Sequence, residues 1–392
     1  MNKQKLHSYP IIGLFMAFLV AVLVMSLMTE PQDYNSREEK ELAQHPRIYA
    51  CSSFDEFTAA WDAFVNDQFP GRNEIITAKQ ESEINSEGDA IVNEVYVLSN
   101  DYLFAYTYPT QNKDVQKLME AITSKRADSA LPFTYIVVPQ KNLILAEQEP
   151  TVDITIDENN TTRLISALNA YGIPKINCCD YIRSFPLEER ANFFYKTDFH
   201  WNEYGAYVAA DYIAQNLAAT KIISKTSIPT DNDFIWSDLT GLAYLGDLQK
   251  RFSEEVTVEE YIPFYVAVDG ENFKYYTELN GEEVPRNTIV ASGINTHPLD
   301  YNKLSIYNLG YLRVENPNAA EDKHVLILKD SYECCLTDYF SEMFSEIDIV
   351  DPRSDCPSFD EIVEARGIDQ VLMIYHNSNV SQELIKYLSK KK

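Results

Sequence analysis

The stretch KHVLILKDSY, residues 323–332, decides the fold that the sequence predicts. Residues 324–328 form a continuous, mostly apolar run, which is typical of a strand buried on both faces of a sheet. A two-residue turn then leads to Ser331, and a helical pattern from about Tyr332 to Phe344 follows. In an open parallel sheet, ligands bind at the carboxyl ends of the strands. We therefore expect Ser331 at the ligand-binding edge of the sheet.

The same alternation of strand and helix extends outward from this stretch. Further strands are predicted at Phe133–Val138, Ile173–Ile176, Ile347–Val350 and Val371–Tyr375. Helices are predicted at Thr161–Tyr171, from the cap Asn202 to about Leu217, at Phe359–Ala365 and at the C-terminus. This order predicts an α/β domain, with a mostly parallel sheet between two layers of helices.

Residues 228–305 interrupt the alternation and predict a β-rich insertion over the sheet. Its strand-like pieces are Tyr261–Val268, Phe273–Tyr276 and Thr288–Ala291. Upstream, helices are expected over residues 54–87 with a break at Pro70-Gly71, and a hairpin over Glu94–Tyr108.

The N-terminal residues predict a single membrane anchor. The apolar segment 11–28 would span about 27 Å as a helix, close to the hydrocarbon thickness of a bilayer. Lys3 and Lys5 precede it and acidic residues follow it, so the positive-inside rule puts the N-terminus in the cytoplasm and the bulk of the chain outside. A cleaved signal peptide is the alternative, but the residues around Ser26 make poor cleavage sites.

We therefore divide the chain into three parts. Residues 1–29 are the cytoplasmic tip and transmembrane anchor, 30–90 a stalk with the N-terminal helices, and 91–392 the α/β domain with its insertion. The protein is expected in the cell membrane as a single-pass protein, with a catalytic domain outside the cytoplasm.

Charge excludes some partners. The chain has 33 Lys and Arg against 60 Asp and Glu, a formal net charge of −27. Nucleic-acid binding relies on basic patches that neutralise phosphates, so no nucleic-acid partner is expected. Six cysteines in 392 residues indicate neither a disulfide scaffold nor a zinc ribbon.

A serine hydroxyl is a weak nucleophile unless a base assists it. Of the six histidines, only His200 and His376 are expected near Ser331. Asp198 and His200 share a face of an extended segment, because positions i and i+2 point the same way. Asp198 can orient the ring while the other ring nitrogen takes the Ser331 proton. His376, which follows the last strand, is the reserve base.

Other roles for these residues stay open. Asp330 or Ser331 could cap the helix, and Asp198 with His200 could stabilise a loop. Cys335 should share a helix face with Ser331 and is a second nucleophile to consider, although structural packing suits it better. Asp198 and His200 also offer two metal ligands, but no further ligand is spaced nearby. No metal and no cofactor are therefore predicted.

The sequence resembles the DHHW family, which is similar to the outer-facing alginate O-acetyltransferases with an SGNH-hydrolase-like domain. The segments that carry the resemblance are EEKELAQHP (38–46), TDFHW (197–201) and KDSY (329–332). The order along the chain, with Asp and His before Ser, also matches. The resemblance implies an SGNH-like three-layer domain in which Ser331 is the nucleophile, His200 the general base and Asp198 the group that orients it.

The chain departs from the family pattern at the motif itself. Phe199 stands where a second His is usual, and we expect its side chain to point away from Asp198 and His200. Lys329 stands where ordinary SGNH enzymes have Gly before the Asp-Ser pair.

The oxyanion donors also differ from the family. Residues 307–311, YNLGY, replace a Gly-Gly-Asn or Gly-Gly-Asp element of related sequences. The backbone N–H groups of Ser331 and Tyr332 are the expected donors, because the start of a helix leaves such groups unpaired. Gly241 is a weaker backbone candidate.

The predicted function is a serine O-acyltransferase that moves acetyl groups onto a cell-envelope polysaccharide. The resemblance implies a multi-span membrane acyl carrier as partner, since the acetyl donor inside the cell cannot cross unaided. Trp201 and Lys329 are expected substrate contacts. An acetyl esterase on the same triad and a non-catalytic carbohydrate-binding protein are the alternatives.

The anchor generates a first prediction. The intact protein should fractionate with membranes, and protease added to intact cells should digest the residues after about Glu30. Deleting residues 1–29 should release the protein into the soluble fraction. A soluble, secreted species that lacks the first 28 residues in the unaltered protein would contradict an uncleaved anchor.

Overall fold

The computed structural model describes residues 13–17, 20, 24–25, 28, 30–35, 40–75, 78–79, 90–98, 101–149, 151–251, 253, 255–256, 258–290 and 298–390. Half of the predicted anchor at 11–28, with Lys3 and Lys5 before it, lies outside these residues. In the part that is described, no helix is both long enough and apolar enough to cross a bilayer.

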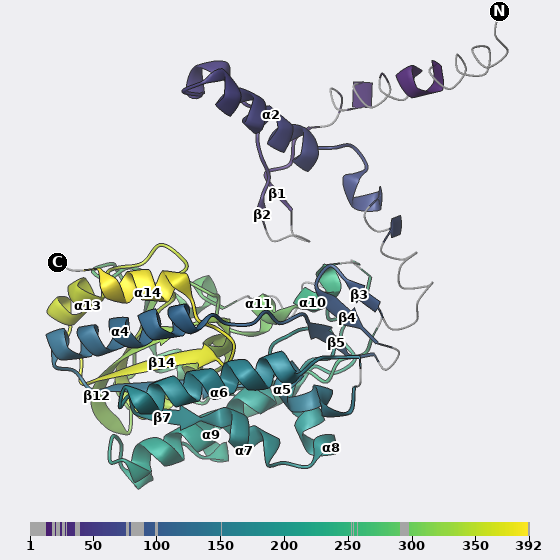
Figure 1. Cartoon of the computed structure of the whole chain (residues 1–392). Coiled ribbons are helices and arrows are strands. Elements are labelled where there is room, and N and C mark those ends of the chain that lie inside the picture. The colour runs from purple at the N-terminus through teal and green to yellow at the C-terminus, as the bar shows by residue number, and fades with distance from the viewer. Residues whose placement is uncertain are drawn as a thin grey trace, which may run out of the picture. The chain divides into compact units, whose positions relative to one another are not determined.

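The chain divides into two compact units (Figure 1). The N-terminal unit comprises residues 1–93 with 250–254, and the α/β unit comprises 94–249 with 255–392. The described elements of the N-terminal unit are β1 (Tyr34–Asn35), β2 (Lys40–Glu41), η1 (Ile48–Ala50), α2 (Phe54–Asp67) and β3 (Ala90–Val92). Helix α2 begins after Ser53, whose side chain accepts a hydrogen bond from the Glu56 N–H. It ends before Pro70-Gly71, where the break was predicted.

A seven-stranded mixed sheet forms the centre of the α/β unit. Its order is β10-β11-β13-β12-β14-β6-β7, and the five strands from β13 to β7 are parallel. These are β13 (Phe344–Val350), β12 (Glu321–Lys329), β14 (Gln370–His376), β6 (Phe133–Val138) and β7 (Lys175–Asn177). The edge strand β10 (Lys274–Tyr276) and its neighbour β11 (Tyr311–Glu315) each pair antiparallel with the strands beside them. The predicted α/β domain with a mostly parallel sheet is confirmed.

Helices cover both faces of this sheet (Figure 1). One layer holds α4 (Asn112–Ser129), α6 (Thr155–Ala170), α13 (Phe359–Ala365) and α14 (Gln382–Ser389). The other holds α7 (Cys178–Arg183), α9 (Glu203–Ala219) and α12 (Thr337–Met343). Right-handed crossovers between parallel strands require this division, since connections that run in opposite directions along the sheet pack on opposite faces.

The remaining elements are short. The hairpin β4 (Val95–Val97) and β5 (Leu103–Ala105) lies where it was predicted. The short helices are α5 (Lys141–Leu145), α8 (Leu187–Arg190), α10 (Asp247–Lys250) and α11 (Tyr301–Leu304). The described 3₁₀ turns of this part are η2 (Ala146–Gln148), η3 (Ala191–Phe193), η4 (Lys225–Ser227), η5 (Asp231–Asp233), η6 (Gly270–Asn272), η7 (Arg286–Thr288) and η9 (Ser331–Cys335).

The insertion at 228–305 differs from its prediction in two ways. Strands β8 (Phe234–Asp238) and β9 (Pro263–Ala267) form a separate two-stranded sheet, but β10 joins the central sheet beside β11. The strand predicted at Thr288–Ala291 is not found over residues 288–290, because the chain turns at η7 and Val290 makes only an isolated bridge to Ile306; Ala291 lies outside the described residues.

The helix predicted from Tyr332 to Phe344 is also wrong as one element. A five-residue 3₁₀ turn, η9, comes first, and α12 begins only at Thr337.

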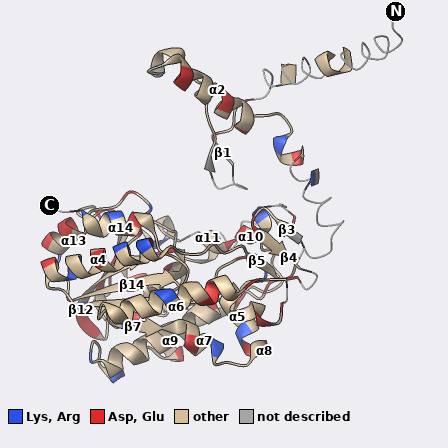
Figure 2. Cartoon of the chain, viewed as in Figure 1, with Lys and Arg blue, Asp and Glu red and all other residues tan. Residues whose placement is uncertain are grey.

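The central strands are buried along most of their length, and charged residues lie mainly on the helices and loops around them (Figure 2). This burial fixes the ends of the strands, where the site lies.

Candidate active site

Ser331 lies directly beyond the carboxyl end of β12, at the middle of the sheet. The pairing of β12 with β14 ends at Lys329 and Ile374, and the Asp330 N–H still donates to the Ile374 carbonyl at 3.1 Å. The Asp330 carboxylate then accepts from the His376 N–H at 2.9 Å and from the Tyr332 N–H at 3.1 Å. These bonds hold the turn that presents the Ser331 hydroxyl.

The side chains of Ser331, His200 and Asp198 form one hydrogen-bonded chain. Nδ1 of His200 lies 2.7 Å from Oδ1 of Asp198, and Nε2 lies 2.8 Å from Oγ of Ser331. Because the carboxylate accepts from Nδ1–H, Nε2 is the ring nitrogen that accepts the serine proton. The serine is 131 residues from the histidine in sequence. The geometry is that of a nucleophile, a base and an orienting acid.

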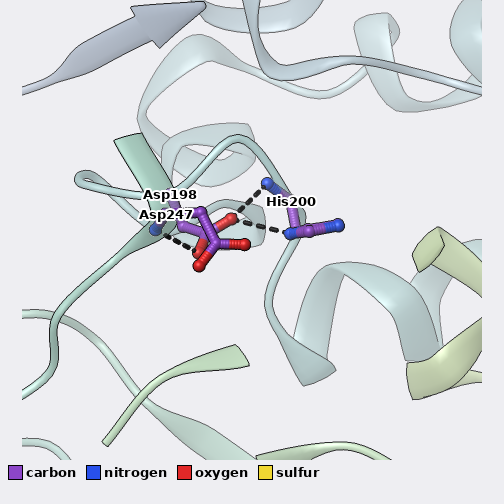
Figure 3. A group of neighbouring side chains, drawn as sticks. All are labelled: Asp198, His200 and Asp247. Carbon is purple, nitrogen blue, oxygen red and sulfur yellow. Dashed lines mark hydrogen bonds and ion pairs between the residues drawn. The ribbon is translucent and has the colours of Figure 1, made fainter. Parts of the chain in front are cut away.

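Every oxygen of the Asp198 carboxylate has a donor (Figure 3). Oδ1 also accepts from the His200 N–H at 3.0 Å, and Oδ2 accepts from the Asp247 N–H at 2.9 Å and the Tyr244 hydroxyl at 3.3 Å. Burial raises the pKa of Asp198, but His200 and these hydrogen bonds outweigh burial and hold that pKa below its ordinary value. Asp198 is therefore ionised, as an orienting acid must be.

Gly246 lets the Asp247 N–H reach this carboxylate. A Cβ on Gly246 would lie 2.3 Å from the carbonyl carbon of Thr197 and 2.6 Å from the Asp198 nitrogen. Only glycine permits such a close approach of two backbones. Residues 244–247 thus supply the second half of the Asp198 hydrogen-bond shell, which the sequence analysis did not predict.

Two buried charges hold the segment that carries Asp198. The Lys141 ammonium donates to the carbonyls of Tyr195 at 3.0 Å, Lys196 at 2.8 Å and Asp198. From the other side, Glu260 accepts from the backbone N–H groups of Lys196 and Thr197, each at 2.7 Å. Burial lowers the pKa of Lys141 to about 7, although Glu260 and Asp198 act to raise it.

Tyr301 covers the imidazole. Its ring stacks on the His200 ring with a centroid distance of 3.8 Å and an angle of 3° between planes. Its hydroxyl donates to the Ser331 carbonyl at 2.7 Å. The same side chain therefore restrains both the base and the serine.

The two predicted substrate contacts, Trp201 and Lys329, are buried instead. Trp201 is 1% exposed, and its indole N–H donates to the Tyr332 carbonyl at 3.0 Å. Lys329 is 2% exposed, and its ammonium donates to Oδ1 of Asn308 at 2.6 Å and contacts Sγ of Cys334. Neither side chain can meet a polymer from solvent, so these predictions are wrong.

The predicted oxyanion donors are only partly available. The Tyr332 N–H is occupied by the Asp330 carboxylate, which caps η9. Gly241 lies in an exposed turn closed by the Leu242 N–H and the Leu239 carbonyl. Of the two predicted donors, the N–H groups of Ser331 and Tyr332, the one on Ser331 remains for an oxyanion.

Three further residues lie near the site. His376 reaches the same edge as Ser331, but its Nδ1 accepts from the Ser378 N–H at 3.3 Å. Phe199 does not point away from His200, since the two ring centroids are 3.9 Å apart. Cys335 is buried and its Sγ contacts the Tyr301 hydroxyl at 3.3 Å. Burial raises the pKa of Cys335 well above its ordinary value, which disfavours a thiolate nucleophile.

Asp198, His200 and Asp247 could also be considered as metal ligands, because one ligand atom of each lies within 4.8 Å of the others. Asp247 is a third candidate ligand that the spacing in sequence did not predict. However, both ring nitrogens of His200 and both oxygens of Asp198 are engaged in the hydrogen bonds above. A cation would have to displace those donors, so the donor set favours the triad arrangement.

The fold and this edge of the sheet define an SGNH-hydrolase-like α/β domain. Residues 105–272 match the family model ALGX, described as the SGNH hydrolase-like domain of the acetyltransferase AlgX. This match confirms the resemblance seen in the sequence to proteins with an SGNH hydrolase-like domain. No curated protein matches the chain in sequence.

Two solved structures are similar in fold. PatB1 of Bacillus cereus has a TM-score of 0.65 at 20% identity, and the alignment covers 75% of this chain and 99% of PatB1. It was also solved with a sulfonyl adduct. A DHHW family protein from Eubacterium siraeum DSM 15702 has a TM-score of 0.59 at 14% identity, with 76% and 96% of the two chains covered.

The residues around the triad generate a second prediction. Changing Lys141→Met leaves three carbonyls without their buried donor and removes a positive charge that favours the ionised form of Glu260, so we expect ester turnover to fall by about tenfold or more because the Asp198 segment shifts. The free energy of unfolding should fall by roughly 3–5 kcal/mol. Turnover per folded molecule and thermal unfolding are the measurements.

Lys125→Met is the matched control. Lys125 is also buried and also donates to a carboxylate, Asp360, and to a carbonyl, that of Lys390. It belongs to α4, away from the triad, so this variant should lose stability and keep its turnover. Equal losses of turnover in both variants would contradict a specific role for Lys141.

Proposed function

We propose that the protein is a serine O-acyltransferase that transfers acetyl groups to hydroxyls of a cell-envelope polysaccharide. The observation that carries the proposal is the continuous chain from Asp198 through His200 to Oγ of Ser331, with distances of 2.7 Å and 2.8 Å. Ser331 lies just beyond the carboxyl end of a central parallel strand, which is where ligands bind in open sheets of this kind. The similarity of residues 105–272 to an acetyltransferase domain supports the acetyl group as cargo.

The reaction has two halves. Ser331 Oγ attacks the acetyl carbonyl of the donor ester while Nε2 of His200 accepts the serine proton. The donor alcohol then leaves with that proton, and an acetyl ester remains on Ser331. In the second half, His200 takes the proton of an acceptor hydroxyl, which attacks the acetyl-enzyme and restores Ser331. Asp198 stays ionised throughout and stabilises the imidazolium.

The Ser331 N–H lies on the reacting residue itself, so it is the donor proposed for the oxyanion that forms on the acetyl carbonyl. Tyr301 keeps the imidazole between Asp198 and Ser331, since stacking opposes rotation of the ring. Water in place of the acceptor hydroxyl would give an esterase with the same first half.

The cellular setting completes the proposal. The apolar segment 11–28 would anchor the protein in the membrane, with the catalytic domain outside the cytoplasm. A multi-span membrane acyl carrier would deliver the acetyl group to the outer face, as the family resemblance implies.

The third prediction concerns the triad. Ser331→Ala, His200→Gln and Asp198→Asn should each lower hydrolysis of a chromogenic acetyl ester by about 10³-fold or more, and combining two changes should add little, because the three groups act as a unit. The folds should remain intact by circular dichroism. Adding an oligosaccharide to the unaltered protein should divert acetyl from water to sugar.

His324→Gln is the matched control for the histidine. His324 pairs with the buried Asp348 at the opposite end of β12, so it shares the chemistry of His200 without a serine partner. Turnover should survive this change. The proposal fails if Ser331→Ala keeps its activity. If the unaltered protein releases acetyl only to water even when an oligosaccharide is present, the result favours the esterase.

A further inference from the structure

A groove in the α/β unit lies outside the site described above. It runs between α7, α9 and residues 229–231, and its volume is about 520 Å³. Pockets that take small molecules are commonly roughly 300–1,000 Å³, so this groove is large enough for a ligand.

Aromatic side chains form much of its wall. They are Tyr181, Phe185, Tyr204 and Tyr207, and all four are half-buried. Their neighbours hold them in place: Tyr181 meets Phe185 edge to face at 5.2 Å, and the Tyr207 hydroxyl donates to Asp231 at 2.6 Å. Rings that are already fixed lose little conformational entropy when a ligand covers them.

The charges on the groove have one sign. Glu189, Asp211 and Asp231 line it, and none of its ten lining residues is Lys, Arg or His. A uronate or phosphate group would therefore meet like charges without a cation to balance them. Carboxylates accept hydrogen bonds, which suits a ligand rich in hydroxyl or amino donors.

We propose that this groove binds hexose units of an uncharged or amino-bearing glycan. A hexose ring has an apolar C–H face, which can lie on an aromatic ring, and a rim of hydroxyl donors, which the carboxylates can accept. An acyl chain would bring no hydrogen-bond donor to the three carboxylates, and a simple cation would leave the four rings uncovered. The inference rests on the proposed function, because it assigns the charge class of the polysaccharide acceptor.

Helix α9 connects the groove to the triad, because His200 lies just before its first residue. Tyr204 lies four residues after His200, just inside the start of the helix that Asn202 caps. From Tyr204 to Asp211 the helix rises by about 10 Å, at 1.5 Å per residue. A glycan held along this face would extend from the end of α9 that directly follows His200.

The test measures binding to the full chain with Ser331→Ala, so that turnover does not interfere. Three oligosaccharides of equal length serve as probes: an uncharged glucan, its amino-bearing counterpart and its uronate counterpart. We expect the first two to bind and the uronate to bind about tenfold more weakly or worse. Tyr204→Leu should weaken glucan binding by about tenfold while the same change in the active protein leaves turnover of a small acetyl ester unaltered.

Glu189→Lys should weaken the amino-bearing probe and improve the uronate, and Glu188→Lys is its control. Glu188 is an exposed neighbour on α8 that does not line the groove. Equal binding of the uronate and the glucan, no binding of any probe, or unchanged binding in both Tyr204→Leu and Glu189→Lys would each overturn the groove proposal. Ester turnover without glycan binding contradicts the groove alone, whereas glycan binding with no Ser331-dependent turnover contradicts the proposed acyl transfer.

Discussion

The buried carboxylate of Asp198 is the interaction on which the site depends. An ionised acid that is fully buried is stable only when its oxygens are hydrogen-bonded, and here His200, Asp247 and Tyr244 supply the donors. His200 lies on the same loop as Asp198, whereas Tyr244 and Asp247 lie on a second segment that Gly246 allows to come close. The carboxylate therefore ties together two segments that are distant in sequence. The imidazole orientation follows from this arrangement, and the serine contact follows from the imidazole.

The central sheet supplies the other half of the geometry. Strand β12 is paired on both sides with parallel strands, so the position of Ser331 is set by the ends of three buried strands. The segment that carries His200 is held from outside the sheet by Lys141 and Glu260. Two independently supported elements therefore meet at the hydrogen bond between Nε2 and Oγ, and the bond from the Trp201 indole to the Tyr332 carbonyl joins the same two elements.

Much of this could be predicted from sequence, because the signals are local. Buried parallel strands appear as continuous apolar runs, and β6 occupies Phe133–Val138 as predicted. The Asp-x-His spacing and a serine after a strand made Asp198, His200 and Ser331 candidates, and the structure brings these three side chains into hydrogen-bond contact. Lys141 and Tyr301 were missed because their roles depend on tertiary contacts. A lysine within the apolar helix α5 was the one available signal, since a buried charge requires partners.

Burial also explains the errors. Trp201 and Lys329 were assigned to substrate because tryptophan and lysine often contact ligands, but residue type does not reveal that both are almost fully enclosed. The helix expected after Ser331 is divided because Asp330 caps a tight 3₁₀ turn first. The most direct test of the central claim is to quench the protein during turnover of an acetyl ester and locate the acetyl group by peptide mass spectrometry. The account predicts one acetyl group on Ser331, lost in His200→Gln, whereas acetyl on Cys335 or labelling that is independent of His200 would contradict it.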